Sequence, residues 1–142
     1  MNLRYVRKRE RQKTYKFNVL AECEDDRQCE LLSFLNGLEG DLVSHGLRML
    51  NLLERIALEG PPRREEVCHQ IRGPIFQCGQ GHIRVLWFYD EGQMVICSHG
   101  FIKTSRKPPQ RQIRRAENAY RRYFDDKTKG AINIIEDEEE NR

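Results

Sequence analysis

The strongest constraint on the fold is a pair of apolar segments joined by a turn that contains glycine. In residues 83–90, apolar side chains occupy both alternating sets of positions, and residues 94–102 form a second extended, mostly apolar segment. The intervening residues 90–93 (DEGQ) suit a β-hairpin turn. Because both faces of the first segment are apolar, we expect it to be an interior strand of an antiparallel sheet.

Two further segments have the pattern of strands. Residues 15–21 alternate apolar and polar side chains, which predicts a strand with one buried face. Residues 67–77 are also extended in character, but Gly73 and Pro74 interrupt them, so we expect an edge or bent strand. With the hairpin, these segments predict a twisted antiparallel sheet of about four strands.

Three segments carry apolar residues at helical spacing. The first follows Asp25 and stops at Gly37, the second follows a predicted N-cap at Asp41 and stops at residues 60–62 (GPP), and the third starts at Pro109. We expect the second helix to pack on the sheet and on the first helix. The apolar faces contain Leu31, Leu32 and Leu35, then Val43, Leu47, Leu50, Leu53 and Ala57, and finally Ile113, Ala116, Tyr120, Tyr123 and Phe124.

Chain length, hydropathy and cysteine usage indicate a cytoplasmic protein. A chain of 142 residues is long enough for one domain with tails and short for two. It has no apolar run long enough to cross a membrane and starts with charged residues, so we expect neither membrane insertion nor secretion. The five cysteines are odd in number and lack a C-x-x-C pair, which favours reduced and mostly buried thiols at Cys23, Cys29, Cys68, Cys78 and Cys97.

Charge is distributed unevenly along the chain. Residues 1–13 are rich in lysine and arginine and hold a single acid, which predicts a flexible or partly helical basic arm before a domain at residues 14–129. Residues 130–142 form a tail that carries consecutive carboxylates from Glu136 to Glu140. The net charge of +3 therefore hides a basic body, which either attracts a polyanion such as nucleic acid or is a solvated face without a partner.

The tail allows two interpretations. Its carboxylates form either a disordered, solubilising end or a segment that folds over the basic body and mimics RNA phosphate. Three isoleucines, Ile132, Ile134 and Ile135, predict a short strand or a segment that docks on a partner.

The densest group of chemically active side chains lies where the last predicted strand enters a loop. Within a few residues the chain places His99, Lys103, Arg106 and Lys107. An imidazole and several cations suit metal-free RNA cleavage, in which one group activates the 2′-hydroxyl, another protonates the departing 5′-oxygen and cations stabilise the phosphate charge. Arg84 could bring a guanidinium to the same phosphate. The alternatives are a loop that only binds phosphate, and a half-buried His99 that shares strand parity with the core.

A series of spaced motifs runs in order through residues 67–124. The motifs are IRG at 71–73, IFQ at 75–77, IRVLWF at 83–88, HGFIK at 99–103, Lys107, Pro109, Ile113 and Ala116. They resemble the RelE/HigB toxin family, in the branch that includes HigB and the phage Gp49-like proteins. That branch typically reads as an I-R-G turn, an E-L-R strand, an R-hydrophobic strand and F-x-K-K-T-x-K-T-P before a helix with I-x-x-A.

The resemblance implies both a fold and an activity. The fold would be α+β and RelE-like, with two N-terminal helices packed on a small antiparallel sheet of about four strands, plus a C-terminal helix. The protein would be the toxin of a type II toxin–antitoxin system, a ribosome-dependent mRNA endonuclease that uses the substrate 2′-hydroxyl and needs no metal or other cofactor. Its partners would be mRNA on the ribosome and a cognate helix-turn-helix antitoxin similar to HigA.

Carried over by position, the resemblance also implies site residues. Arg84, Lys103 and Lys107 match family cations, and His99 matches a position that is often histidine. Lys103 and Arg84 would stabilise the phosphorane, with His99 or Lys107 as the group that transfers protons. Further cations expected to bind RNA are Arg106, Arg111, Arg114 and Arg115.

The chain departs from the family pattern at three positions. Gly79 stands where the family carries the arginine of its E-L-R strand, Thr104 replaces the second lysine, and Pro108 replaces a threonine. These departures allow reduced, redirected or absent nuclease activity. The alternative function is a binding module without catalysis, either a ParE-like gyrase inhibitor or a phage nucleic-acid-binding protein on the same scaffold.

A zinc site is a further alternative to weigh. The pairs Cys78-x3-His82 and Cys97-x-His99 could converge across neighbouring strands as four ligands, since strand alternation places Cys97 and His99 on the same side. Because this spacing is not that of a standard knuckle and cysteine is commonly a small core residue, we expect no metal.

Overall fold

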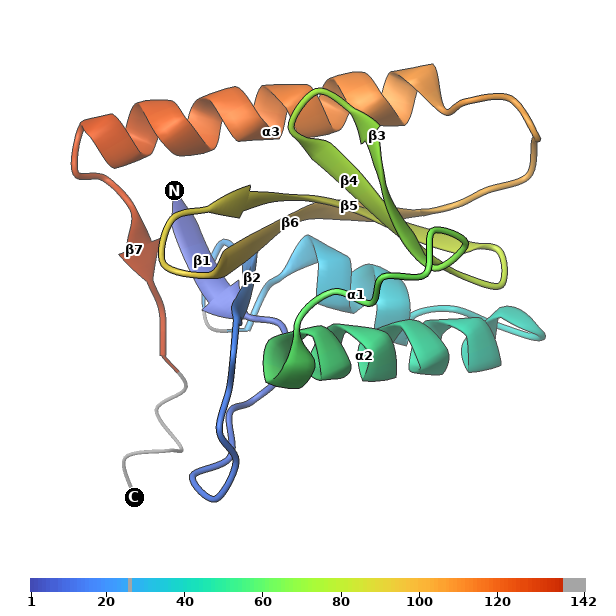
Figure 1. The fold of residues 1–142 in the computed structure, drawn as a ribbon, viewed down its shortest axis with the longest axis horizontal. Coiled ribbons are helices and arrows are strands. Elements are labelled where there is room, and N and C mark those ends of the chain that lie inside the picture. Colours follow the sequence, from blue (N-terminus) through green and yellow to red (C-terminus); the bar gives the residue numbers. More distant parts are fainter. Residues whose placement is uncertain (26, 137–142) are drawn as a thin grey trace.

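The computed structural model describes residues 1–25 and 27–136, and within these ranges the chain forms three helices and seven strands (Figure 1). In chain order the elements are β1 (Asn2–Tyr5), β2 (Asn18–Glu22), α1 (Glu30–Asn36), α2 (Leu42–Glu59), β3 (Cys68–Arg72), β4 (Ile75–Gln80), β5 (Ile83–Asp90), β6 (Met94–Ile102), α3 (Gln110–Thr128) and β7 (Asn133–Ile134). None of the helices in these ranges is long and apolar enough to span a membrane.

All the strands belong to one mixed sheet, in the order β3-β4-β5-β6-β2-β1-β7. Strands β3 to β6 form an antiparallel meander, and β1 is antiparallel to β2. Two pairs are parallel, β2 with β6 and β1 with β7. The segment from α1 to β5 therefore separates two strands that lie side by side.

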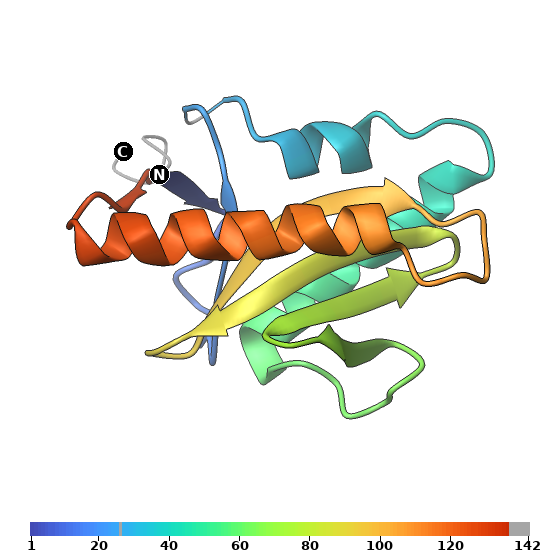
Figure 2. The same ribbon diagram turned by 90° about the horizontal axis from the view of Figure 1, so that it is seen from above.

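Helices cover the two faces of the sheet unequally. Helix α3 lies across one face, and α1 and α2 lie on the other (Figures 1 and 2). Each face has its own apolar cluster. On the α1/α2 face it includes Leu31, Met49, Leu53, Ile56, Val85 and Trp87, and on the α3 face it includes Leu20, Leu86, Phe88, Ile96, Ile113 and Tyr123.

Strand β5 is buried on both faces, as its sequence predicts. Val85 and Trp87 point to the α1/α2 face, Leu86 and Phe88 point to the α3 face, and none of the four is more than 1% exposed. The predicted bounds of this strand and of β6 agree with the structure. The interior position of β5, between β4 and β6, is confirmed.

A β-bulge in β6 changes which side chains face α3. Leu86 is opposite His99 and Trp87 is opposite Cys97, so Ser98 is the additional residue on β6. Cys97 therefore lies in the α1/α2 cluster, whereas Phe101 lies in the α3 cluster. The expectation that His99 shares its face with Cys97 is wrong, because simple alternation does not hold across a bulge.

The expected antiparallel sheet of about four strands is also wrong, because the sheet has seven strands and mixed polarity. The basic N-terminal segment is neither flexible nor helical at residues 2–5, where β1 buries Leu3 completely. The segment at 67–77 is a hairpin of two strands, β3 and β4. The predicted short strand near Ile134 is confirmed as β7, which pairs with β1.

The helices largely follow the predicted apolar spacing. Helix α2 has Asp41 as N-cap and ends before Gly60, and α3 has Pro109 as N-cap. The predicted apolar face of α2 needs one correction, because Val43 and Leu47 are 45% and 58% exposed. These two side chains lie on the solvent-exposed side of α2, whereas Gly46, Met49, Leu50 and Leu53 are buried.

The cysteines are only partly as expected. Cys23, Cys29 and Cys97 are free and buried, which confirms the prediction for these three. Cys68 and Cys78 form a disulfide, so the expectation of free thiols is wrong at both. They are directly opposite each other on β3 and β4, and the register of the hairpin brings their Cα atoms to 4.2 Å.

The two ends of the described chain meet beside β1. The amino group of Met1 donates a hydrogen bond to Asp126 Oδ2 on α3, and the amide of Asn133 donates to the Met1 carbonyl. The predicted acidic tail lies outside the described residues from position 137 onward.

We expect reduction of the Cys68–Cys78 disulfide to lower the free energy of unfolding by about 2–3 kcal/mol, since the bond closes a short loop in the unfolded chain. Denaturant unfolding with and without reductant measures this change. Alkylation of the denatured, unreduced protein should label the three free cysteines, and a Cys68→Ala/Cys78→Ala variant should be insensitive to reductant. Labelling of all five cysteines before reduction would contradict the pairing.

Candidate functional site

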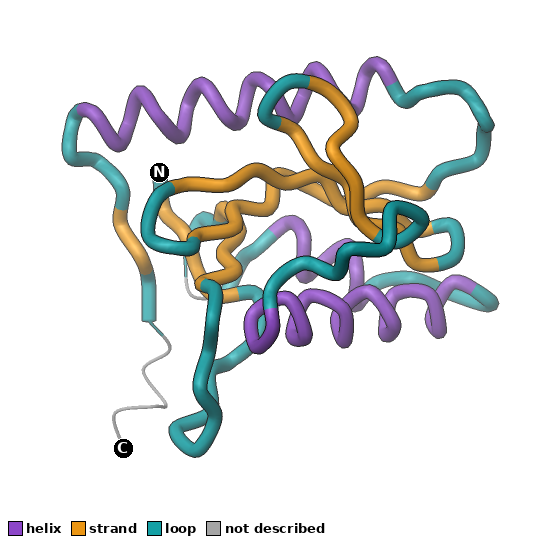
Figure 3. The backbone as a smooth tube through the Cα atoms, viewed as in Figure 1, coloured by secondary structure: helices purple, strands orange, loops and turns teal. Residues whose placement is uncertain are grey.

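The candidate site lies where β6 passes into the loop that leads to α3, at one end of the sheet (Figure 3). A hollow of about 620 Å³ opens there, between the β4–β5 turn and this loop. Its charged lining is cationic and comes from β5 and the loop. The lining residues are His82, Arg84, Ile102, Lys103, Thr104, Ser105 and Arg106.

Arg84 lines the hollow from β5 and braces the turn before it. By strand alternation its side chain leaves the sheet on the α3 face, as those of Leu86 and Phe88 do. Its Nη1 donates hydrogen bonds to the carbonyls of Gly81, at 2.6 Å, and of Ile83, at 3.0 Å. Burial lowers the pKa of Arg84 from its usual value, yet a guanidinium remains protonated in proteins.

Gly79, the position at which the resemblance implies an arginine, leaves space for the Arg84 side chain. Gly79 is the cross-strand neighbour of Arg84 on β4. A Cβ atom at this position would be 3.0 Å from Arg84 Nη1, so the guanidinium lies directly over the glycine backbone. The departure from the family pattern thus removes one cation and gives Arg84 the space beside the turn.

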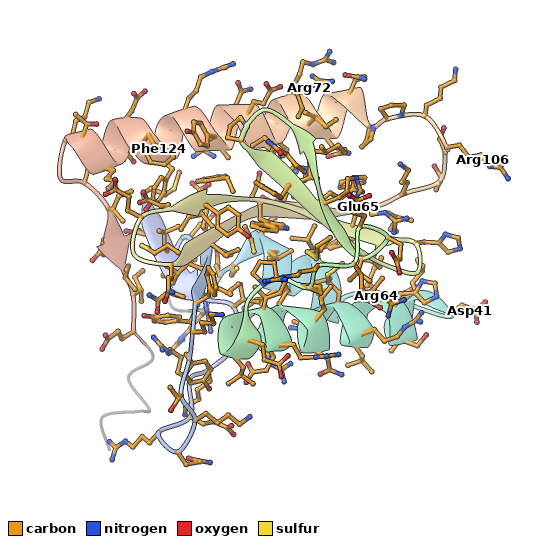
Figure 4. The ribbon with its side chains drawn as sticks, viewed as in Figure 1. Asp41, Arg64, Glu65, Arg72, Arg106 and Phe124 are labelled. Carbon is orange, nitrogen blue, oxygen red and sulfur yellow. A yellow bond between two sulfur atoms is a disulfide. The ribbon has the colours of Figure 1, made fainter. Side chains whose placement is uncertain are left out.

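Lys103 is fixed at the junction of two hollows. Its amide donates a 2.7 Å hydrogen bond to the His82 carbonyl, which continues the β5–β6 pairing by one step. Besides the first hollow it lines a second one, of about 260 Å³, with Lys107 and Arg111. Arg106 lies on the outer side of the loop and extends into solvent (Figure 4).

His99 does not join these cations. It is 1% exposed, lies under α3 and lines neither hollow. Its Nε2 is 2.8 Å from Gln112 Oε1, which can only accept, and its Nδ1 is 2.9 Å from Ser98 Oγ. Burial lowers the pKa of His99 below its usual value. These contacts describe a neutral imidazole that ties β6 to α3.

The three arginines of α3 that were expected to bind RNA do not all lie beside the two hollows. Arg111 lines the second hollow, and Arg114 is exposed on the helix. Arg115 forms an ion pair with Glu30 and lines a separate cleft of about 560 Å³ beside α1. Arg115 is therefore a contact between α3 and α1.

The ligand set weighed for zinc is not assembled. Cys78 is bonded to Cys68, and its sulfur accepts a hydrogen bond from Trp87 Nε1. The bulge directs Cys97 and His99 to opposite faces of the sheet. The four side chains therefore do not share a centre.

His82 is the functional candidate that the sequence analysis placed in the wrong context, as a zinc ligand only. It directly follows Gly81 in the β4–β5 turn, and Arg84, two residues later, lies on β5. The β4–β5 turn lies beside the loop after β6, and His82 is exposed and lines the cationic hollow between them. Its position beside a matched family cation was the signal that could have identified it.

Comparison with known proteins identifies one family. The model of the family described as phage-derived protein Gp49-like matches residues 41–121, more than half of the chain. This match contains α2, strands β3 to β6 and most of α3, and therefore every residue that lines the two hollows. No curated protein matches the chain.

The buried His99 predicts a pH-dependent stability. Because the folded state resists protonation of this ring and the unfolded state does not, the free energy of unfolding should fall as the pH drops below about 6.5, by up to about 1.4 kcal/mol per pH unit. Denaturant unfolding between pH 5 and 8 measures the slope. A His99→Gln variant should lose part of it, and the control His69→Gln, at an exposed position on β3, should retain it. Equal slopes for the wild type and His99→Gln would contradict the assignment.

Proposed function

Since the chain belongs to the phage-derived Gp49-like family, within the RelE/HigB-like toxin superfamily, we propose that it is the toxin of a type II toxin–antitoxin system and cleaves mRNA on the ribosome. The observation that carries this proposal is the hollow at the end of β5 and β6, which is lined by Arg84, Lys103 and Arg106. Three cations around one concavity provide a site for a phosphodiester.

In the proposed reaction, the largest catalytic contribution is stabilisation of the negative charge that develops on the phosphate. The 2′-oxygen attacks the adjacent phosphorus, and the bond from phosphorus to the 5′-oxygen breaks, which leaves a 2′,3′-cyclic phosphate and a 5′-hydroxyl. Negative charge develops on the phosphoryl oxygens as the 2′-oxygen bonds. Arg84 and Lys103 stabilise this charge from two sides of the hollow, and no metal or other cofactor takes part.

Protonation of the leaving 5′-oxygen is assigned to Lys107. Its exposed ammonium group lies in the same loop as Lys103, and the two residues line the second hollow together. Burial and two hydrogen-bond partners support a structural role for His99 instead. The exposed cations Arg106, Arg111 and Arg114 bind the RNA backbone on either side of the scissile phosphate.

The proposed setting follows from the substrate. mRNA on the ribosome places the protein in the cytoplasm, where a cognate antitoxin with a helix-turn-helix domain, similar to HigA, neutralises it. The antitoxin acts by covering the loop at residues 103–109 or by preventing entry to the ribosome. Residues 14–129 are the toxin domain in this proposal, although β1 and β7 from outside this range complete the sheet.

Induced expression in bacteria tests the activity. We expect growth arrest, together with new mRNA 5′-hydroxyl ends that arise only on ribosomes. Lys103→Ala and Arg84→Ala should each lower cleavage by at least about 100-fold, because each removes a cation from the developing phosphate charge. Lys129→Ala, at the far end of α3, is the control and should cleave normally.

The alternative, a binding module without catalysis, makes a different prediction for the same strains. Gly79 favours it, because the family arginine is missing there. Growth arrest with intact mRNA would overturn the nuclease, and inhibited gyrase in those cells would identify the ParE-like activity. Normal growth of bacteria that express the protein would overturn both toxin functions.

A further inference from the structure

We propose that His82 is the general base of the cleavage reaction and that His45 positions it from the opposite face of the sheet. This inference rests on the proposed function and assigns the group that removes the proton from the 2′-hydroxyl. The observation that carries it is an exposed histidine that lines the hollow together with Arg84, Lys103 and Arg106 and whose backbone is held at its amide and its carbonyl.

The first anchor of His82 is Lys103. The His82 carbonyl accepts a 2.7 Å hydrogen bond from the Lys103 amide, so the backbones of the two residues are joined across the edge of the hollow. A group that takes the 2′-proton must lie next to the cation that stabilises the phosphate, since the 2′-oxygen attacks the phosphate carried by the 3′-oxygen of the same ribose. This backbone contact provides that proximity.

The second anchor is His45, which lies on α2. The His82 amide donates a 3.0 Å hydrogen bond to His45 Nδ1, and the two rings are 5.4 Å apart with their planes tilted by 40°. Because the amide is the donor, Nδ1 of His45 carries no proton and the neutral ring has its proton on Nε2. Helix α2 therefore supports the turn from the face opposite α3.

Gly81 permits this contact. Its φ angle is +58°, which side chains disfavour, and a Cβ atom there would lie 2.3 Å from His45 Nδ1. Arg84 holds the same residue from the other side, since its Nη1 donates to the Gly81 carbonyl. The turn is thus fixed by α2 and by β5, which orders the backbone beneath His82 before substrate arrives.

The chemistry assigned to His82 balances with the rest of the site. The unprotonated ring nitrogen takes the proton from the 2′-hydroxyl as the 2′-oxygen bonds to phosphorus. Lys107 gives a proton to the departing 5′-oxygen, and both side chains then exchange protons with water. The charged and titratable groups around His82 are Arg84 from β5, Lys103 and Arg106 from the loop, and His45 from α2.

The other imidazoles of the chain are less suited to this role. His99 is buried beneath α3 and lines neither hollow. His69 lies on the edge strand β3, where its Nδ1 is 3.1 Å from the Glu65 carbonyl. His45 is half-buried and its Nδ1 is engaged by the His82 amide. Of the four histidines, His82 is the one that lines the hollow with Arg84, Lys103 and Arg106.

Single-turnover cleavage of ribosome-bound mRNA by the full-length protein, followed from pH 5 to 9, tests the assignment. We expect His82→Gln to reduce the rate by about 100-fold or more and to remove the acidic limb of the pH–rate profile, because the base is lost. Added imidazole should restore part of the rate to His82→Ala. His69→Gln is the matched control and should retain the wild-type rate and profile.

His45 has its own readout as a positioning residue. His45→Ala should lower the rate while the acidic limb remains, and His45→Gln, whose amide oxygen can accept from the His82 amide, should restore much of the rate. Thermal unfolding of each variant identifies any that fail to fold, and imidazole rescue then applies to the folded ones. A wild type that cleaves, together with a His82→Gln variant of equal rate and profile, would overturn the assignment alone. A wild type that does not cleave would overturn the proposed function and the assignment with it.

Discussion

The pairing of β5 with β6, including the bulge at Ser98, is the interaction on which the other features of the molecule depend. Strand β5 is apolar on both faces, so it requires helices on both sides of the sheet. The bulge adds one residue to β6, and from that point the alternation of its side chains is inverted. As a result His99 and Phe101 face α3, and Lys103 leaves the sheet beside Arg84.

The candidate site is a consequence of how this strand pair ends. The β4–β5 turn and the loop after β6 meet there, and backbone hydrogen bonds fix both before any substrate arrives. Arg84 has two roles. Its guanidinium lies over Gly79 and donates hydrogen bonds to the carbonyls of the turn, which holds the turn in place, and it adds positive charge to the hollow.

Sequence periodicity predicted the elements whose burial is decided locally. The bounds of β5 and β6 and the end of α2 at Gly60 follow from alternation, helical spacing and glycine. Strand β1 was not predicted, and β7 was predicted only as one of two alternatives. Each strand is short and is stabilised by partners far away in the chain. The disulfide depends on the register of β3 and β4, which no spacing rule reveals.

The candidate site was predictable in its cations but not in its geometry. Arg84 and Lys103 were found by motif and do share a hollow, whereas His99 was assigned to the wrong face because a bulge leaves no sequence signal. Arg115 was counted as an RNA ligand because its partner, Glu30, is remote in sequence. Long-range pairing of this kind decides which cations remain available to a substrate.

The most direct test of the central claim is a structure of the protein on a ribosome that carries mRNA with a 2′-O-methyl group at the cleavage position, which blocks attack. We predict that the phosphate 3′ to the methylated ribose lies in the hollow, within hydrogen-bond distance of Arg84 and Lys103. A phosphate bound elsewhere, for example along the exposed face of α3, would contradict it.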